Sequence, residues 1–183
     1  MKIHEVGKST PDMNPPEHFL VALLPVLAYV VVRDRRLPSL RLVAVVGLGS
    51  QFPDLIDKSL AYQLGLIPSG RVFMHSLPTA LPFLLGVGYY AWKTDRRRLG
   101  GAFTFAHLSH LFADFYTAFL GPTRYIPPEL LWPLGPPVAR RASPHWAGPG
   151  SINVHLWTLF SLVVLSITVY LLIIDVRKQL KSR

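Results

Sequence analysis

The chain has 183 residues and a formal net charge of +9; half of its residues are hydrophobic and 16% are charged. This balance is typical of a membrane protein and excludes an ordinary soluble globule. Cysteine is absent, so disulfides, thiolate ligands and cysteine nucleophiles are excluded, and any metal ion must be held by histidine and carboxylate side chains.

Five apolar runs predict an all-α fold, a polytopic membrane helix bundle of about five transmembrane helices. A flexible N-terminal arm, residues 1–17, precedes them. The runs are HFLVALLPVLAYVVV (18–32), LVAVVGLGSQF (42–52), LPTALPFLLGVGYYAW (77–92), LGGAFTFAHLSHLFADFYTAFL (99–120) and INVHLWTLFSLVVLSITVYLLII (152–174). The last run is long enough to cross a hydrocarbon core of ~30 Å, whereas the second covers only part of it.

The segments between and after the runs complete a single membrane domain over residues 18–176. Gly47 and Gly49 in the second run favour close helix packing. A loop rich in proline, glycine and tryptophan (121–151) follows the fourth run, and a basic tail (177–183) follows the fifth.

The basic residues predict the orientation of these helices. With the C-terminus in the cytoplasm and the N-terminus outside, 12 of the 19 Lys and Arg residues flank the cytoplasmic ends. The excess positive charge therefore lies on one side of the membrane. This asymmetry explains the net charge as a topology signal and removes the reason to expect nucleic-acid binding.

Ionisable residues gather at the opposite, extracytoplasmic ends of the predicted helices. The set is His18, Asp54, Asp57, Arg71, His75, His107, His110 and Asp114. The histidines play no part in the charge rule, yet they fall on one side. Charged or imidazole side chains facing lipid are costly, so these residues are expected to face the bundle interior.

Helical geometry supports a shared face in the fourth run. At about 100° per residue, His107, His110 and Asp114 lie at about 0°, 300° and 340°, within an arc of about 60°. Neutral imidazole and carboxylate are common ligands of first-row metals. We therefore predict one wall of a metal site here.

Simpler roles remain open for some of these residues. A lone histidine such as His155 more often packs or hydrogen-bonds between helices, and His4 and His145 lie in segments that look flexible. Asp57 can cap a helix or support a ligand, and Arg71 can anchor at the interface or clamp a phosphate.

Several motifs, in order, resemble the YdjM-like family of predicted inner-membrane metal-dependent hydrolases of bacteria and archaea. They are EHF (17–19), GLGSQFPDLID (47–57), RVFMHSL (71–77), HLSHLFADFYT (107–117) and LLWPL (130–134). The resemblance covers roughly residues 14–135. A more distant similarity is to the zinc-dependent phospholipase C and single-strand nuclease superfamily, and this is an analogy of fold rather than of function.

The resemblance implies a multi-pass protein of a bacterial or archaeal plasma membrane with a site for zinc or another divalent ion. Its implied metal ligands are His18, Asp54, Asp57, His75, His110 and Asp114, with His107 less firmly placed. Many members have a histidine where this chain has Gly70. That difference implies one ligand fewer, or a substitute such as His107 or His155.

Six or seven ligand candidates exceed the needs of one catalytic zinc ion, so two or more ions are expected. Two ions can activate water and stabilise the leaving oxygen of a phosphoester. We assign catalytic roles to Asp54 and Asp114, either of which can bridge ions, and to Arg71, which can hold a phosphate oxygen. A site at the outer interface predicts a lipid-linked phosphoester as substrate and membrane lipid as partner, with the loop PPELLWPLGPP (127–137) shaping its entrance.

Two other functions use the same residues. A metal-ion or proton transporter also places histidine and aspartate inside the membrane, although the inner halves of the later runs offer no ionisable continuation. A non-enzymatic membrane subunit with a structural metal ion is the other alternative.

Overall fold

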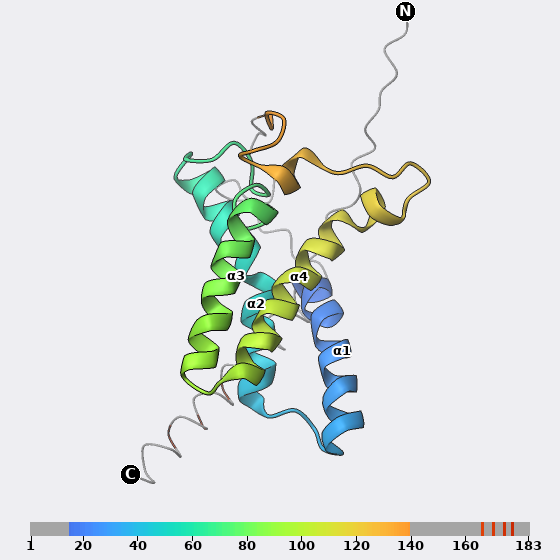
Figure 1. Cartoon of the computed structure of the whole chain (residues 1–183), viewed down its shortest axis with the longest axis vertical. Coiled ribbons are helices and arrows are strands. Elements are labelled where there is room, and N and C mark those ends of the chain that lie inside the picture. The colour runs from blue at the N-terminus through green and yellow to red at the C-terminus, as the bar shows by residue number, and fades with distance from the viewer. Residues whose placement is uncertain (1–14, 140–165, 167–169, 171–173, 175–176, 178–183) are drawn as a thin grey trace, which may run out of the picture.

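The structure is a computed structural model that describes residues 15–139 and the single residues Ser166, Tyr170, Ile174 and Arg177. Within that part of the chain it is all-helical, as predicted, with no strand. The elements are α1 (Pro15–Asp34), α2 (Leu40–Lys58), a π-helical turn η1 (Ser59–Gln63), α3 (Leu77–Lys93), α4 (Arg97–Leu120) and a 3-10 turn η2 (Pro128–Leu131) (Figure 1). The predicted fifth helix and most of the flexible arm lie outside the described residues.

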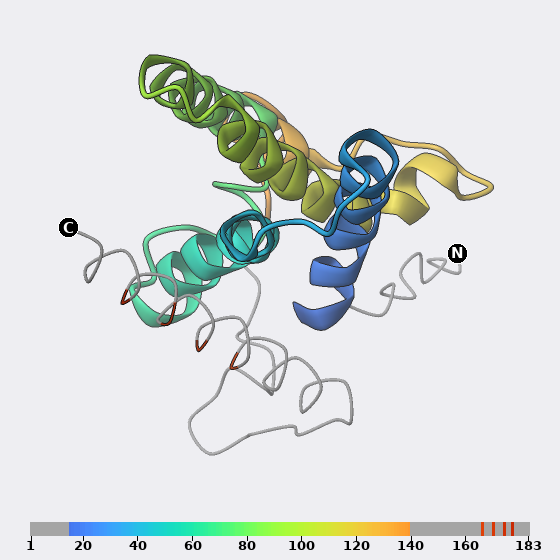
Figure 2. The ribbon, with the colours of Figure 1, turned by 90° about the horizontal axis from the view of Figure 1, so that it is seen from below.

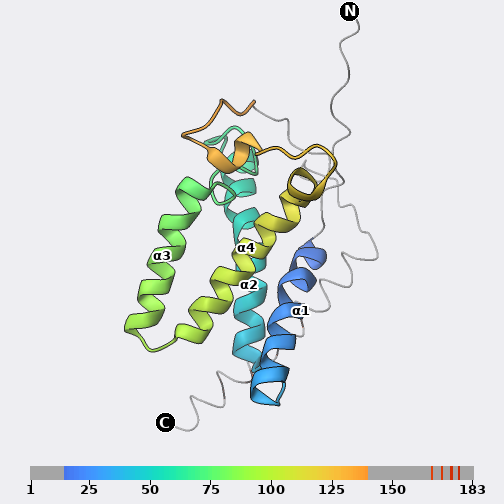
Figure 3. The same cartoon turned by 45° about the vertical axis from the view of Figure 1, so that its right-hand side comes forward.

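The four helices run alternately up and down the bundle. The short connections at 35–39 and 94–96 lie at one end, which we call the turn end, and the connector 64–76 and the segment 121–139 lie at the other, the connector end (Figures 1 and 3). Helix α4 contacts all three other helices, α2 most extensively, and the view along the bundle shows them arranged around it (Figure 2).

A glycine on α2 permits a close contact with α4. A Cβ atom at Gly49 would lie 2.7 Å from the backbone oxygen of Phe103 on α4, too close for any side chain. At Gly47 a Cβ atom would meet the Phe19 ring at 3.4 Å. The predicted role of these glycines in close packing is therefore confirmed most clearly at Gly49, where α2 meets α4.

Helix α2 is longer at both ends than its apolar run predicts. It begins after Ser39, whose hydroxyl accepts a hydrogen bond from Leu42 N, and it continues through Pro53 to Lys58. A proline inside a helix removes one backbone hydrogen bond and crowds the preceding turn, yet α2 continues past Pro53 for five more residues. Its 19 residues span about 28 Å at ~1.5 Å each, and its last turns carry Asp54 and Asp57.

The apolar core lies between the turn end and the polar residues. Its fully buried cluster comes from α1, α2 and α4 and comprises Ala22, Val30, Leu42, Val46, Ala102 and Ala106. On each helix these residues lie between the turn end and the first polar candidate, His18, Asp54 or His107. A second cluster of Leu111, Phe115 and Leu130 attaches η2 to α4 at the connector end.

Among the described residues, α1 is the one helix both long and apolar enough to cross a membrane by itself. Helix α4 has 24 residues but carries the histidines and Asp114, and α3 has 17 residues. The polar stripe that makes α4 a candidate site also lowers its hydropathy.

Candidate metal centre

Helix α4 contributes two potential ligands, His110 and Asp114, one helical turn apart. Both side chains are buried, and His110 Nε2 lies 3.8 Å from Asp114 Oδ2. The i, i+4 spacing puts them on one face, as the sequence predicts. This face is directed at α2 and at the connector 64–76.

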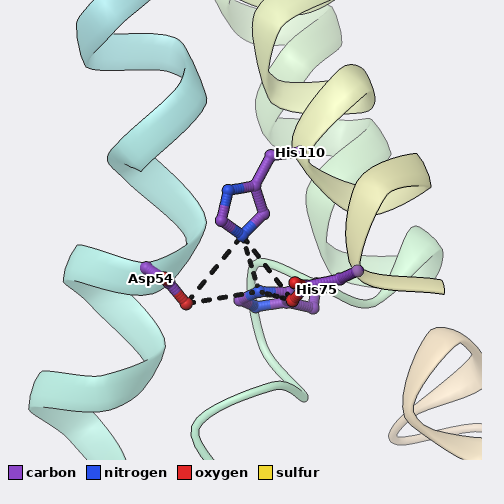
Figure 4. Close-up of side chains that lie close together, drawn as sticks. Asp54, His75 and His110 are labelled. Carbon is purple, nitrogen blue, oxygen red and sulfur yellow. Dashed lines mark hydrogen bonds and ion pairs between the residues drawn. The ribbon is translucent and has the colours of Figure 1, made fainter. Parts of the chain in front are cut away.

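Asp54 of α2 and His75 of the connector reach the same point. Asp54 Oδ1 lies 3.7 Å from His75 Nε2 and 3.8 Å from His110 Nε2 (Figure 4). His75 Nε2 lies 3.0 Å from His110 Nε2 and 3.2 Å from Asp114 Oδ2. One ligand atom from each residue lies within 4.8 Å of all the others, and all four residues are buried. This ligand group of Asp54, His75, His110 and Asp114 could hold a metal ion.

Hydrogen bonds at the far ring nitrogens turn both imidazoles toward the ligand group. His75 Nδ1 lies 2.8 Å from Asp57 Oδ2, and His110 Nδ1 lies 2.6 Å from the Ser50 carbonyl oxygen. Because these oxygens only accept, each Nδ1 carries the donated proton. Both Nε2 lone pairs then converge near Asp54 Oδ1, which has no hydrogen-bond partner among the described residues. A cation placed between these atoms would satisfy the converging lone pairs, so the residues fit a metal ion.

A proton can satisfy the same lone pairs when no metal ion is bound. Burial lowers the pKa of His75, but the hydrogen bonds and charges of Asp114 and Asp57 outweigh it and raise that pKa to about 9. His75 lies in the connector, outside the helices. At neutral pH a metal ion therefore competes with a proton for this ring.

Asp57 supports the ligand group without joining it. Its carboxylate is fully buried and accepts hydrogen bonds from the backbone nitrogens of Phe73 at 2.9 Å and Met74 at 2.7 Å, besides the His75 ring. The sequence left two roles open for Asp57, capping a helix or supporting a ligand, and this geometry matches the second. It holds the connector against α2 and thereby places His75.

Two cationic side chains border the ligand group. Arg71 Nε lies 3.0 Å from Asp114 Oδ2, and its Nη2 donates to Asp114 Oδ1 at 3.2 Å. Lys58 donates to Asp54 Oδ2. Sequence reasoning missed Lys58, although its spacing of four residues from Asp54 on one helix is a recognisable signal. Ser50 was also missed, because a carbonyl partner leaves no signal in side-chain chemistry.

His18 lies beside the ligand group. Its ring stacks on the His110 ring with centroids 3.9 Å apart, and its Nε2 lies 3.3 Å from Asp114 Oδ1. His18 Nδ1 is buried and has no hydrogen-bond partner among the described residues. His18 thus contacts two of the four potential ligands, His110 and Asp114.

His107 is directed elsewhere. Its Nε2 donates to the carbonyl oxygen of Met74 at 2.9 Å, and its ring lies among aromatic side chains, with the Phe52 centroid 6.2 Å away. It therefore holds the connector rather than joining the four ligands. Gly70 lies against Tyr62, whose ring a Cβ atom there would meet at 2.9 Å. His4, His145 and His155 lie outside the described residues.

Comparison with known proteins gives one family. The family model described as "YdjM inner membrane protein" matches residues 13–178. No curated protein and no solved structure matches the chain. The match covers every helix in the described part of the chain and all four residues of the ligand group.

Proposed function

Because the chain belongs to the YdjM inner membrane protein family, we propose that it is a membrane-embedded, metal-dependent hydrolase of a lipid-linked phosphoester. The ligand group carries this proposal: four buried residues from three separate elements bring their ligand atoms within 4.8 Å of one another. Two imidazoles and two carboxylates match the nitrogen and oxygen ligands of zinc. A divalent ion held there supplies Lewis-acid chemistry and a hydrolytic nucleophile at neutral pH.

The chain itself supplies groups suited to a phosphate. Arg71 and Lys58 each contact a carboxylate of the ligand group, so both cations lie within reach of an anion bound beside a metal ion. An arginine can hold two phosphate oxygens at once, and a lysine acts as a point charge. In this proposal the two side chains exchange their carboxylate contacts for the substrate phosphate.

The surroundings of the ligand group favour a lipid-borne substrate. Exposed apolar side chains occur on both segments of the connector end: Leu64 and Leu66 on one, and Tyr125, Ile126 and Leu134 on the other. Exposed apolar clusters of this kind mark contacts with membranes or partners. Trp132 packs edge-on against Phe73 with centroids 6.3 Å apart, and so links the predicted entrance loop to the connector.

We propose the predicted topology for this protein: about five spans, with the N-terminus and the connector end outside and the C-terminus in the cytoplasm. The arginines of both short connections lie at the turn end, as the positive-inside rule requires. Helix α1 is the candidate span among the described residues, and the proposal makes it the first crossing. Helices α2, α3 and α4 are proposed to cross with their polar residues turned inward.

The apolar core favours an enzyme over a transporter. An ion path needs polar groups across the membrane, but the side chains between the ligand group and the turn end include the buried Ala22, Val46 and Ala106. In the described part of the chain, the site candidates thus lie on the connector-end side of the apolar core, and we propose that the site opens toward that end. The other alternative is a membrane subunit that holds a structural metal ion and has no activity, and the experiments below distinguish it from a hydrolase.

A matched pair of histidine variants tests the proposal. His110→Gln removes a ligand but leaves a donor for the Ser50 carbonyl, and His107→Gln makes the same change on the same helix outside the ligand group. We expect purified full-length protein and His107→Gln to carry metal by inductively coupled plasma mass spectrometry, and His110→Gln to lose it.

Turnover is measured on the same preparations with lipid phosphoesters. Hydrolysis should require metal and should fall at least 100-fold in His110→Gln and Asp114→Asn. Retained metal without turnover on any phosphoester would favour a structural ion. Protein that carries no metal, or variants that hydrolyse as well as the parent, would refute the enzyme proposal.

A further inference from the structure

A cavity lies at the turn end, away from the ligand group. It has a volume of about 670 Å³ and is lined mainly by α1 and α4, with Leu42 contributed by α2. This size falls in the range of about 300–1,000 Å³ typical of small-molecule sites. Neither the proposed hydrolase function nor the family description uses it.

The walls of this cavity are apolar and open to the surroundings. Val26 and Val30 line it from α1, and Ala102 and Phe105 line it from α4. A Cβ atom at Gly101, also in the wall, would meet nothing within 4 Å. The cavity is therefore a groove along two helices that accepts an extended apolar group.

The mouth of the groove is strongly basic. Arg33 at the end of α1 and Arg97 and Arg98 at the start of α4 all line it. One acidic residue, Asp34, lines it as well, and its carboxylate is engaged by Arg98. Arg33 is held in place by a hydrogen bond to the Tyr29 hydroxyl and lies over that ring. Three guanidinium groups against one paired carboxylate leave a net positive mouth.

We propose that this groove binds an anionic phospholipid, with an acyl chain along α1 and α4 and the phosphate at Arg33 and Arg97. Basic pockets between transmembrane helices on the cytoplasmic side bind anionic headgroups, and the turn end is cytoplasmic in the topology proposed above. The apolar length of the groove favours a lipid over free phosphate, which could use only the mouth.

The fifth apolar run of this chain is the other potential occupant. Four basic residues follow that run, in the tail 177–183. Placing its cytoplasmic end in the groove would bring them beside three arginines, and like charges repel. Charge complementarity thus favours an anionic lipid.

Native mass spectrometry of the full-length protein, titrated with phosphatidylglycerol or phosphatidylcholine, tests this site. Loss of two arginine–phosphate contacts in the double variant Arg33→Gln/Arg97→Gln should weaken phosphatidylglycerol binding roughly 30-fold, with little change for phosphatidylcholine. Gly101→Leu should weaken the binding of both lipids, because its side chain fills the groove. Leucine also favours the helix more than glycine does, so folding should be preserved.

Two matched controls separate the groove from general effects. Arg41→Gln removes an exposed charge near the same end, and Gly88→Leu adds the same side chain on α3 where a Cβ atom also meets nothing within 4 Å. Both should bind phosphatidylglycerol like the parent, and millimolar inorganic phosphate should not compete.

Three results would overturn the proposal. The first is equal binding of the two lipids by the parent protein, and the second is unchanged phosphatidylglycerol binding in both groove variants. The third is efficient cross-linking of a Gly101→Cys variant to a cysteine introduced within residues 152–174, because that result would place the fifth run in the groove. None of these three results depends on metal content or hydrolysis, so the lipid-site proposal and the hydrolase proposal can fail separately.

Discussion

Asp57 accepts hydrogen bonds from the backbone of the connector and from the His75 ring, so one carboxylate sets both the position of a loop and the orientation of a ligand. Partners of this kind fix the tautomer of a metal-binding histidine and raise its basicity. His110 is oriented in the same way by the Ser50 carbonyl. The chemistry of the ligand group therefore also depends on Asp57 and Ser50, which are not members of the group.

Asp57→Asn should separate this supporting role from ligation. The amide keeps the shape of the carboxylate but turns a donor toward backbone N–H groups, so we expect about 10–100-fold weaker metal binding. Unfolding should become easier by about 1–3 kcal/mol. Chelator competition and thermal unfolding measure the two effects. Asp95→Asn, at a turn position with φ 55° that asparagine tolerates, is the control and should change neither.

Metal affinity should depend on pH through His75. Its pKa of about 9 means that a proton must leave the ring when a metal ion binds at neutral pH. Affinity should therefore rise about tenfold per pH unit from pH 7 toward pH 9 and level off above it. Competition with a chelator of known protonation, at several pH values, measures this slope. A metal affinity that stays constant over that pH range would show that metal binding does not remove a proton from the His75 ring.

At the level of elements, the ligand group exists because α2 and α4 approach closely. Gly49 lies five residues before Asp54 and allows the backbone of α2 to meet that of α4 near Phe103. The apolar cluster packs α2 and α4 together on the turn-end side of this contact, and the hydrogen bond between His110 Nδ1 and the Ser50 carbonyl oxygen joins the two helices directly. The distance between Asp54 and His110 is thus a property of helix packing.

Gly49→Ala should disturb the site without touching a ligand. Its Cβ atom would lie 2.7 Å from the Phe103 oxygen, so the helices must separate, at a cost of about 1–3 kcal/mol for overpacking. We expect a lower unfolding temperature and reduced metal content. Gly88→Ala, which meets nothing within 4 Å, should leave metal content unchanged. Equal behaviour of the two variants would contradict the close-packing argument.

Helical spacing in the sequence was sufficient to predict that His110 and Asp114 share a face, and charge asymmetry placed Asp54 and His75 toward the same end. Helical spacing could not show which of His107 and His110 joins the ligand group, because their angular positions on the helix differ by only about 60°. Which of them meets the ligand group depends on where the connector lies across α4. Asp57 and His110 also bond to backbone atoms of Phe73, Met74 and Ser50. Backbone atoms of this kind occur at nearly every residue, so no pattern of residue types predicts these bonds.

Across the whole molecule, the chemistry is divided between the two ends. The connector end holds the ligand group, Arg71 and Lys58, whereas the turn end holds the arginines of both short connections and the groove between α1 and α4. The apolar core separates them. The two proposals therefore concern opposite ends of the chain: the proposed hydrolysis belongs to the connector end, and the proposed lipid binding belongs to the turn end.

The orientation of the two ends can be measured because the chain lacks cysteine. Single variants Thr94→Cys, in the connection between α3 and α4, and Arg124→Cys, after α4, both place a thiol at an exposed position. A membrane-impermeant maleimide added to intact cells should label Arg124→Cys and should label Thr94→Cys only after permeabilisation. The physical reason is that the positive-inside rule retains the arginine-rich turn end in the cytoplasm. Labelling of Thr94→Cys in intact cells would show that the topology is the reverse of the one proposed. The ligand group would then lie on the cytoplasmic side, and its substrate would have to come from that leaflet.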